Sequence, residues 1–321
     1  MRIALIGGAG FVGHHLCQLP HKFLAIDNLG VNNLLTIQKK YRPFIWERLE
    51  MIDDFMPCNA VDYHALSKVL SEFQPDIIVH LSAVAHIDRA EKSPMDTFLN
   101  SQRTLENGLD IARAIDAKFV YFSSSTVYGD FSSDVIDEDE PLTPRGIYGN
   151  VKLAGEAVCR GYHQAYDMDI TIVRPQALYG PRCVSRRVTQ IFIENAMQGK
   201  PIVIHGSGKD KHDFTYIDDL VSGMNLIFKP WEGLRTYNLT GESATSVQAL
   251  ADMVVERFPT EIIHTDADPL KPSRGTMSCG RIRTELGYRP KFPIEIGMDL
   301  YMDWYQEKGY GRQEDQIRST G

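Results

Sequence analysis

The sequence lacks the features that mark several large classes of protein. Its five cysteines, at 17, 58, 159, 183 and 279, are scattered and form no CxxC pair, so neither a disulfide framework nor a metal site is indicated. No apolar run reaches the length that a membrane span needs. There is no internal repeat and no low-complexity tract. These absences leave a globular protein with reduced thiols, no resident metal and no membrane contact.

An excess of basic residues is also missing. The chain has 34 Lys and Arg against 42 Asp and Glu, a net charge of −8, which argues against a nucleic-acid partner because such proteins usually carry a basic face. The apolar N-terminal stretch runs into glycines after six residues, which is too short for the core of a signal peptide. We therefore expect a cytoplasmic protein.

Short apolar runs alternate with longer amphipathic stretches in the first half of the 321-residue chain. Runs of this length and composition are typical of strands buried on both faces of a parallel sheet. The alternation predicts a Rossmann-type α/β fold, a doubly wound parallel sheet with helices on both sides. The expected strands are Arg2–Ile6, Phe23–Ile26, Ile77–Leu81, Lys118–Phe122 and Ile170–Val173, and the expected helices are 11–19, 62–73, 96–116 and 148–167.

The pattern becomes less regular after about residue 176, where helices are expected at 187–199 and 245–258 and a strand at Thr236–Leu239. We predict a sheet domain of residues 1–176 plus about 213–258. A smaller interleaved α/β domain would contain about 177–212 and 259–321. Ligands of open α/β sheets bind outside the carboxyl ends of the strands, so the loops after the strands should line one cleft.

A glycine turn follows the first strand. Gly7, Gly10 and Gly13 give G-x-x-G-x-x-G, in which Gly7 permits the tight turn, Gly10 lets the backbone approach a pyrophosphate, and Gly13 allows close helix packing. Asp27 ends the next strand, where a carboxylate accepts hydrogen bonds from an adenosine ribose and repels a 2′-phosphate. The pattern therefore predicts bound NAD rather than NADP, held by a site that also includes Phe11, Val12 and Asn28.

The segment YGNVK places Tyr148 and Lys152 on one face of a helix. A free tyrosine has a pKa near 10, and a neighbouring ammonium favours its phenolate. The pair can then remove a proton from a hydroxyl while a hydride leaves the same carbon.

These motifs and their spacing resemble the extended short-chain dehydrogenases/reductases, the family of nucleotide-sugar epimerases and dehydratases. The resemblance implies that Ser124, four residues before the tyrosine of VYG, hydrogen-bonds the reacting hydroxyl, with Ser123 and Ser125 as alternatives. It also implies a homodimer formed through helices 96–116 and 148–167. Further NAD contacts would come from Asn59 and Ala60 near the adenine, and from Leu81, Ser82, Ala83, Asn100 and Pro175 towards the nicotinamide.

The same resemblance implies a nucleotide-sugar substrate, with a UDP-linked sugar favoured. Ala177 stands where the family has a substrate-binding asparagine, which is a departure from its pattern. His212 stands at the family's phosphate-facing arginine. The other expected substrate contacts are His86 in HIDRA and the basic residues Arg186, Arg187, Lys271 and Arg274.

The sequence leaves the reaction open. Ser125 and Thr126 occupy the positions where 4,6-dehydratases of the family carry Asp-Glu, which favours a 4-epimerase acting on a nucleoside-diphosphate hexose. HIDRA and Ala177 point instead towards a dehydratase that eliminates water across carbons 5 and 6, with Cys183 as a possible acid–base group. A third hypothesis is a regulatory protein that holds NAD without turnover.

Overall fold

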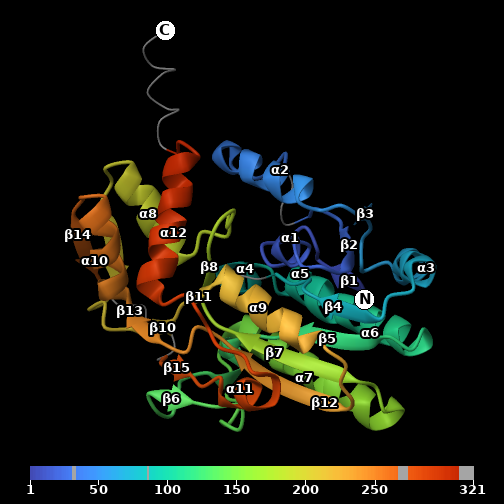
Figure 1. Ribbon diagram of the computed structural model, residues 1–321. Helices are drawn as coiled ribbons and strands as arrows, with labels where there is room; N and C mark the ends of the chain where they lie inside the picture. Colours follow the sequence, from blue (N-terminus) through green and yellow to red (C-terminus); the bar gives the residue numbers. More distant parts are fainter. Residues whose placement is uncertain (31–33, 85–86, 267–273, 311–321) are drawn as a thin grey trace.

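A seven-stranded parallel sheet forms the centre of the protein (Figure 1). The computed structural model describes residues 1–30, 34–84, 87–266 and 274–310. The strand order β12-β7-β5-β4-β1-β2-β3 confirms the predicted doubly wound fold. The strands are β1 (Arg2–Ile6), β2 (Lys22–Asp27), β3 (Phe55–Pro57), β4 (Ile77–His80), β5 (Lys118–Phe122), β7 (Ile170–Pro175) and β12 (Leu234–Leu239).

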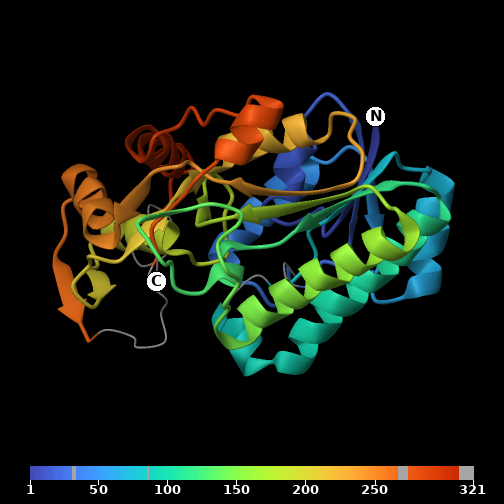
Figure 2. The same ribbon diagram turned by 90° about the horizontal axis from the view of Figure 1, so that it is seen from below.

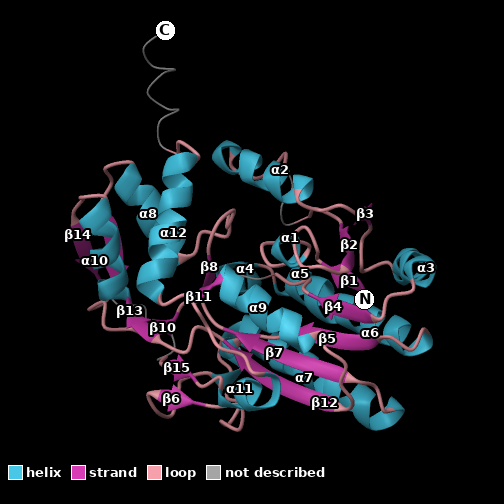
Figure 3. Cartoon of the chain, viewed as in Figure 1, coloured by secondary structure: helices cyan, strands magenta, loops and turns pink. Residues whose placement is uncertain are grey.

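Helices cover both faces of this sheet, because successive side chains of each strand point to opposite sides. In β1, Ile3 and Leu5 join one apolar cluster, and Ala4 and Ile6 join the other. The helices α6 and α7 lie side by side on one face, as Figure 2 shows, whereas α9 lies on the other face with α1 (Figure 3). The bounds of the helices around the sheet are α1 (Gly13–Leu16), α3 (Tyr63–Phe73), α4 (Ile87–Lys92), α5 (Pro94–Phe98), α6 (Thr104–Ala114), α7 (Gly146–Tyr166) and α9 (Ile217–Ile227).

Two predicted helices differ from the structure. The stretch 11–19 contains only the single turn α1, because the chain tightens at Gln18 and Leu19 and must reach β2 within a few residues of Pro20. The stretch 96–116 is divided by a π-helical turn over Leu99–Arg103. None of the helices in the described residues combines the length and apolar character that a membrane crossing requires.

The helix α2 (Arg42–Glu50) was not predicted. Its apolar residues do not keep to one face, so the sequence has no helical period there. Tertiary packing holds it instead: the Phe44 ring packs against Trp304 with ring centroids 4.7 Å apart and planes tilted by 53°, and Glu47 pairs with Lys308 at 2.8 Å.

The smaller region consists of short strand pairs and four helices. Its helix α10 packs on α8 and strand β9 rather than on the large sheet, and its first turn is tied to the loop at Asp210. Residues 247–257 therefore pack against elements of the smaller region, and the domain boundary near 258 stays a prediction. Its elements are β8 (Leu178–Tyr179), β9 (Ile202–His205), β10 (Lys211–Asp213), β11 (Thr215–Tyr216), β13 (Ala244–Ser246), β14 (Ile262–Thr265), α8 (Val188–Met197), α10 (Val247–Arg257), α11 (Gly280–Leu286) and α12 (Ile294–Glu307), with β15 (Thr276–Met277) paired to β6 (Val135–Ile136).

A buried ion pair fixes α7 on the sheet. Arg174 of β7 donates to both carboxylate oxygens of Glu156 in α7, at 2.9 and 2.7 Å. The exposed fractions of the two side chains are 3% and 0%. Ser123 donates to the same carboxylate at 2.7 Å, and Arg174 also donates to the Tyr128 hydroxyl at 2.8 Å. This network joins β7 and α7 to the loop that follows β5.

Arg174→Met removes the buried partner of the Glu156 carboxylate and leaves it only the half-buried Arg160, at 3.2 Å, and Ser123, so the free energy of unfolding should fall by about 3–5 kcal/mol. Urea denaturation measures this change. Replacing both partners, as in Arg174→Met with Glu156→Leu, should recover much of the loss. The matched control is Lys308→Met, which breaks the more exposed pair with Glu47 and should cost at most about 1 kcal/mol. A cost for Arg174→Met no larger than this control would contradict the prediction.

Candidate active site

The glycine turn lies where the strand order reverses. β1 pairs with both β2 and β4, so the connections that leave β1 and β4 run to opposite sides there. Ligands of open α/β sheets bind at such a point. Gly7 has φ +89°, and a Cβ on it would meet the backbone nitrogen of Ser82 at 2.8 Å. A side chain on Gly13 would lie 2.2 Å from the Gly8 carbonyl oxygen. The turn therefore requires glycine at both positions, leaving its backbone open to a ligand near Gly10.

Asp27 faces this turn from the end of β2. Its carboxylate accepts from the Ala9 N–H at 3.2 Å and from the Leu29 N–H at 2.7 Å. Burial raises the pKa of Asp27, and these two backbone hydrogen bonds oppose the rise. Asn28, which follows, donates to the Asn59 side chain at 3.3 Å. The structure thus brings together the residues expected at the adenosine, next to the buried Ala60.

The residues expected near the nicotinamide lie across the crevice. The Ser82 hydroxyl donates to the Asn100 carbonyl at 3.2 Å, and the Leu81 N–H donates to the Ile6 carbonyl at 2.8 Å. Ala83 is half-buried beside them, and Pro175 ends β7 in a buried position. With the glycine turn, which includes Phe11 and Val12, these residues form a continuous edge that fits a dinucleotide.

Tyr148 and Ser124 meet at the carboxyl end of β5. The Ser124 hydroxyl lies close enough to Tyr148 to lower the pKa of its phenol, and it accepts from the Thr126 N–H at 3.2 Å as the N-cap of the short helix Ser125–Tyr128. Ser123 is committed to Glu156, and Ser125 is buried. Ser124 is therefore the hydroxyl that the structure places at the tyrosine.

The cation that acts on Tyr148 is Arg187. Burial raises the pKa of Tyr148, and the Arg187 charge followed by the Ser124 hydrogen bond lowers it. We expected this role for Lys152. In the structure, its ammonium donates to the Phe122 carbonyl at 2.6 Å, and burial lowers its pKa to about 8. No spacing in the sequence could link Arg187 to Tyr148, because they lie in different helical segments.

Arg187 is not neutralised by the protein. It lies half-buried at the N-cap of α8, and no hydrogen bond or ion pair of its side chain occurs within the described residues. Its Nε atom is buried and unpartnered, as is the Thr126 hydroxyl. Within the described part of the chain, a positive charge without a polar partner therefore acts on Tyr148.

Other predicted substrate residues lie at varying distances from this pocket. Arg274 donates to the Ser125 carbonyl at 2.8 Å and lies over Phe131, so it braces the serine loop. Arg186 is exposed, and Ala177 has φ +41° in the turn after β7. The His212 ring packs edge-on to Phe214 in the smaller region. His86 and Lys271 lie outside the described residues.

Cys183 is not at the pocket surface. Its side chain is 1% exposed, and its sulfur lies 3.7 Å from the Ser185 hydroxyl. Its electrostatic neighbours are Arg48, Tyr41 and Tyr301, which belong to the packing of α2 against α12. The acid–base role considered for Cys183 is therefore not supported.

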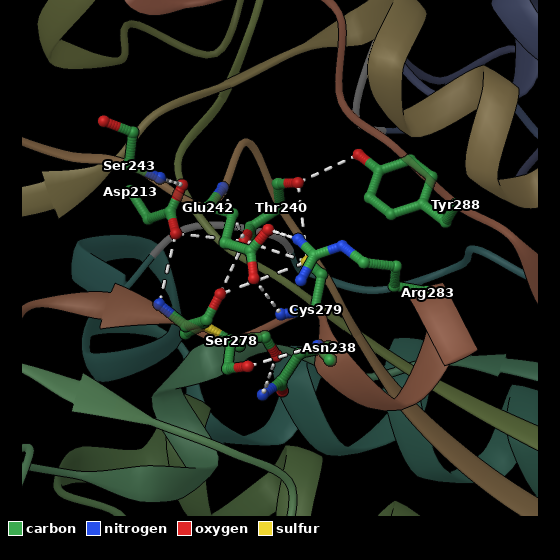
Figure 4. Close-up of polar contacts among 11 residues, drawn as sticks. Asp213, Asn238, Thr240, Glu242, Ser243, Ser278, Cys279, Arg283 and Tyr288 are labelled. Carbon is green, nitrogen blue, oxygen red and sulfur yellow. Dashed lines mark hydrogen bonds and ion pairs between the residues drawn. The ribbon is translucent and has the colours of Figure 1, made fainter. Parts of the chain in front are cut away.

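Asp213, in the segment HDF, has a structural role that the sequence analysis did not identify. Asp213 accepts from the Thr240 hydroxyl at 3.0 Å and from the backbone of Met277 and Ser243 at 3.1 and 3.3 Å (Figure 4). Burial raises the pKa of Asp213 to about 6, although these hydrogen bonds act to lower it. Glu242, also drawn in Figure 4, pairs with Arg283 beside it. This cluster fastens the smaller region to the end of β12.

Comparisons with known proteins agree with this geometry. Residues 3–240 match the model of the NAD dependent epimerase/dehydratase family. A dTDP-glucose 4,6-dehydratase of Haemophilus influenzae is 24% identical, with 95% of this chain and 98% of the relative covered. A UDP-glucuronic acid 4-epimerase from Bacillus cereus, solved with UDP-glucuronic acid and NAD, is 25% identical with a TM-score of 0.86 and covers 96% of this chain and 100% of its own.

A UDP-glucose 4-epimerase from Thermotoga maritima, solved with UDP-glucose, has the same fold, with a TM-score of 0.86 at 21% identity over 96% of this chain and 99% of its own. The family match extends from β1 through β12 and so includes the glycine turn, Asp27, Ser124, Tyr148 and Lys152. NAD is the cofactor of this family. The chain is a member of the NAD-dependent epimerase/dehydratase family.

Proposed function

We propose that this protein is a nucleotide-sugar 4-epimerase that acts on a UDP-linked hexose. The observation that carries the proposal is the composition of the pocket around Tyr148. Ser124 lies beside the tyrosine and lowers its pKa, and the next two residues, Ser125 and Thr126, bear hydroxyls where a 4,6-dehydratase of the family carries an acid and a base. Hydroxyls do not exchange protons with carbon near neutral pH, so elimination has no acid–base pair there.

Ser124 and Tyr148 are placed to act on one sugar hydroxyl. Ser124 orients the hydroxyl on carbon 4, and the Tyr148 phenolate takes its proton while hydride leaves the same carbon. Bound NAD supplies the hydride acceptor and later the hydride donor. Tyr148 would give the proton back to the oxygen on carbon 4 after the sugar has turned, so that the reaction has no net oxidation.

A dehydratase is the second candidate, because curated relatives over 95% of the chain are dTDP-glucose 4,6-dehydratases. Such an activity would need an acid and a base from elsewhere than Ser125 and Thr126. The non-catalytic hypothesis is set aside, because family members are enzymes and the chain keeps Ser124, Tyr148 and Lys152.

Tyr148→Phe should retain bound NAD and lose turnover by about 10²–10⁴-fold, the usual contribution of a positioned acid–base group. The assay incubates the protein with UDP-glucose, UDP-N-acetylglucosamine, UDP-glucuronic acid and dTDP-glucose, then compares product mass and proton couplings. An unchanged mass with altered couplings identifies epimerisation.

Loss of one water from the product would replace the epimerase proposal with the dehydratase. Full activity of Tyr148→Phe would reject the proton-transfer role. The matched control is Tyr166→Phe at the exposed end of α7, which should leave turnover unchanged.

Arg187→Met should move the rising limb of the pH profile of kcat to higher pH. The active form of Tyr148 is the phenolate, and removal of the Arg187 charge raises the pKa of Tyr148, so the active fraction at neutral pH falls. Arg187→Lys keeps a positive charge, so the rising limb should return part of the way to its wild-type pH. A variant that changes KM alone would show that Arg187 binds substrate without acting on Tyr148.

We further propose a homodimer through the helices predicted from the sequence. Two exposed apolar side chains lie close together at the start of this helix pair: Met95 is 71% exposed and Phe98 56%. Large apolar surface in contact with solvent is typical of an interaction site.

Phe98→Asp should convert the dimer to a monomer, because it would bury a charge in an apolar interface. Light scattering with size-exclusion chromatography measures the mass. Ile296→Asp, at a site 50% exposed on α12, is the matched control and should leave the dimer intact. A monomeric wild-type protein would rule out the dimer.

A further inference from the structure

Four basic side chains converge beside the glycine turn. His14 and His15 form the first turn of α1, Arg48 comes from α2, and Arg182 comes from the loop YGPR after β8. His14 and His15 are buried, and Arg48 is 1% exposed. Three segments that are far apart in the sequence therefore meet at His14, the residue that follows the last glycine of the turn.

Hydrogen bonds show which ring nitrogen of His14 carries the proton. Its Nδ1 lies 2.9 Å from the Gly10 carbonyl, which can only accept, so Nδ1 carries the proton. Its Nε2 is then an acceptor, and the Arg182 Nε–H donates to it at 3.1 Å. Burial, with the nearby positive charges, lowers the pKa of His14 and keeps the ring neutral. Arg182 is thus oriented by a histidine whose other nitrogen bonds the glycine turn.

The backbone of the loop is held as firmly as the side chain. Arg48 donates its Nε–H and an Nη2–H to the Arg182 carbonyl, at 3.0 and 2.5 Å. His15 Nε2 lies 3.3 Å from the Pro181 carbonyl. Arg182 has φ +61°, a conformation that L residues rarely adopt, and these contacts hold it.

The cluster has no counter-charge in direct contact. Within the described residues, neither Arg48 nor Arg182 takes part in an ion pair. The acidic groups in electrostatic reach are Asp27 for Arg48, and Glu47 and Asp218 for Arg182. An arginine removed from water normally pairs with an anion. The terminal nitrogens of Arg182 make no hydrogen bond in the described structure and are not sealed in the interior.

We propose that Arg182 donates to a diphosphate, and that this diphosphate is the pyrophosphate of NAD. Only the His14 ring separates its guanidinium from the Gly10 carbonyl. Gly10 lies beside the N–H groups of Phe11 and Val12, where a pyrophosphate contacts the turn. Arg182 is then a binding residue for the cofactor, and His14 and Arg48 are positioning residues. The loop would close over NAD and link the cofactor site to the sugar side of the cleft.

A cycle of ligand truncation tests this assignment without an activity assay. Calorimetry on NAD-free protein compares ADP-ribose with adenosine, which differ by the pyrophosphate and the distal ribose. It also compares UDP with uridine, which isolates the substrate's diphosphate. In Arg182→Met, the affinity ratio of ADP-ribose to adenosine should fall about 10- to 100-fold, the range of a charge-assisted hydrogen bond. The UDP-to-uridine ratio should stay unchanged, and NAD co-purifying with the variant should decrease.

Each other outcome overturns the proposal. A fall in the UDP-to-uridine ratio alone would assign Arg182 to the substrate's diphosphate. Unchanged ratios for both pairs would show that Arg182 is structural. The matched control is Arg289→Met, an exposed arginine of the smaller region, which should leave both ratios unchanged.

His14→Phe provides the second variant, and it decides the matter if Arg182→Met fails to fold. It keeps the Arg182 charge and removes the acceptor that orients it. The ADP-ribose-to-adenosine ratio should fall about 3- to 10-fold, as for loss of one neutral hydrogen bond. A ratio equal to that of wild type would reject the positioning role of His14.

Discussion

The contact between Arg174 and Glu156 determines where the reactive groups lie. It attaches the middle of α7 to β7, and the Ser123 hydroxyl donates to the same Glu156 carboxylate. Tyr148, Lys152 and Glu156 follow one another at helical spacing along a single face of α7. Because Glu156 is fixed on the sheet and Ser123 is fixed to Glu156, the next residue, Ser124, meets Tyr148.

Burial of this network sets the electrostatics of the pocket. Desolvation alone disfavours a tyrosine phenolate and a lysine ammonium together, which is the direction of both shifts at Tyr148 and Lys152. Ser124 and Arg187 oppose the shift at Tyr148. Arg187 comes from the segment that leads into the smaller region, so contacts between the two regions contribute to the electrostatics of Tyr148.

A second junction ties the same loop to the cofactor side. Residues 181–182 contact His14, His15 and Arg48, and residue 187 begins α8 beside Tyr148. One short connection thus lies against the glycine turn, Tyr148 and the smaller region. Its positive φ values at Ala177, Arg182 and Arg186 show how sharply the chain turns to do so.

Local chemistry allowed much of this site to be predicted from the chain alone. The sheet strands, the glycine turn, Asp27 and the Tyr148–Lys152 spacing depend on short-range patterns: apolar runs, turn geometry and helical periodicity. The choice of Ser124 over Ser123, the burial of Cys183, the helix α2 and the action of Arg187 on Tyr148 depend on contacts between distant segments. No period or spacing records such contacts, because burial and charge proximity arise only when the segments pack. The sequence by itself determined the fold class, the glycine turn and the Tyr148–Lys152 spacing. Tertiary packing decided that the Lys152 ammonium bonds the Phe122 carbonyl, that the Arg187 charge acts on Tyr148, and which neighbouring side chains hold the structure together.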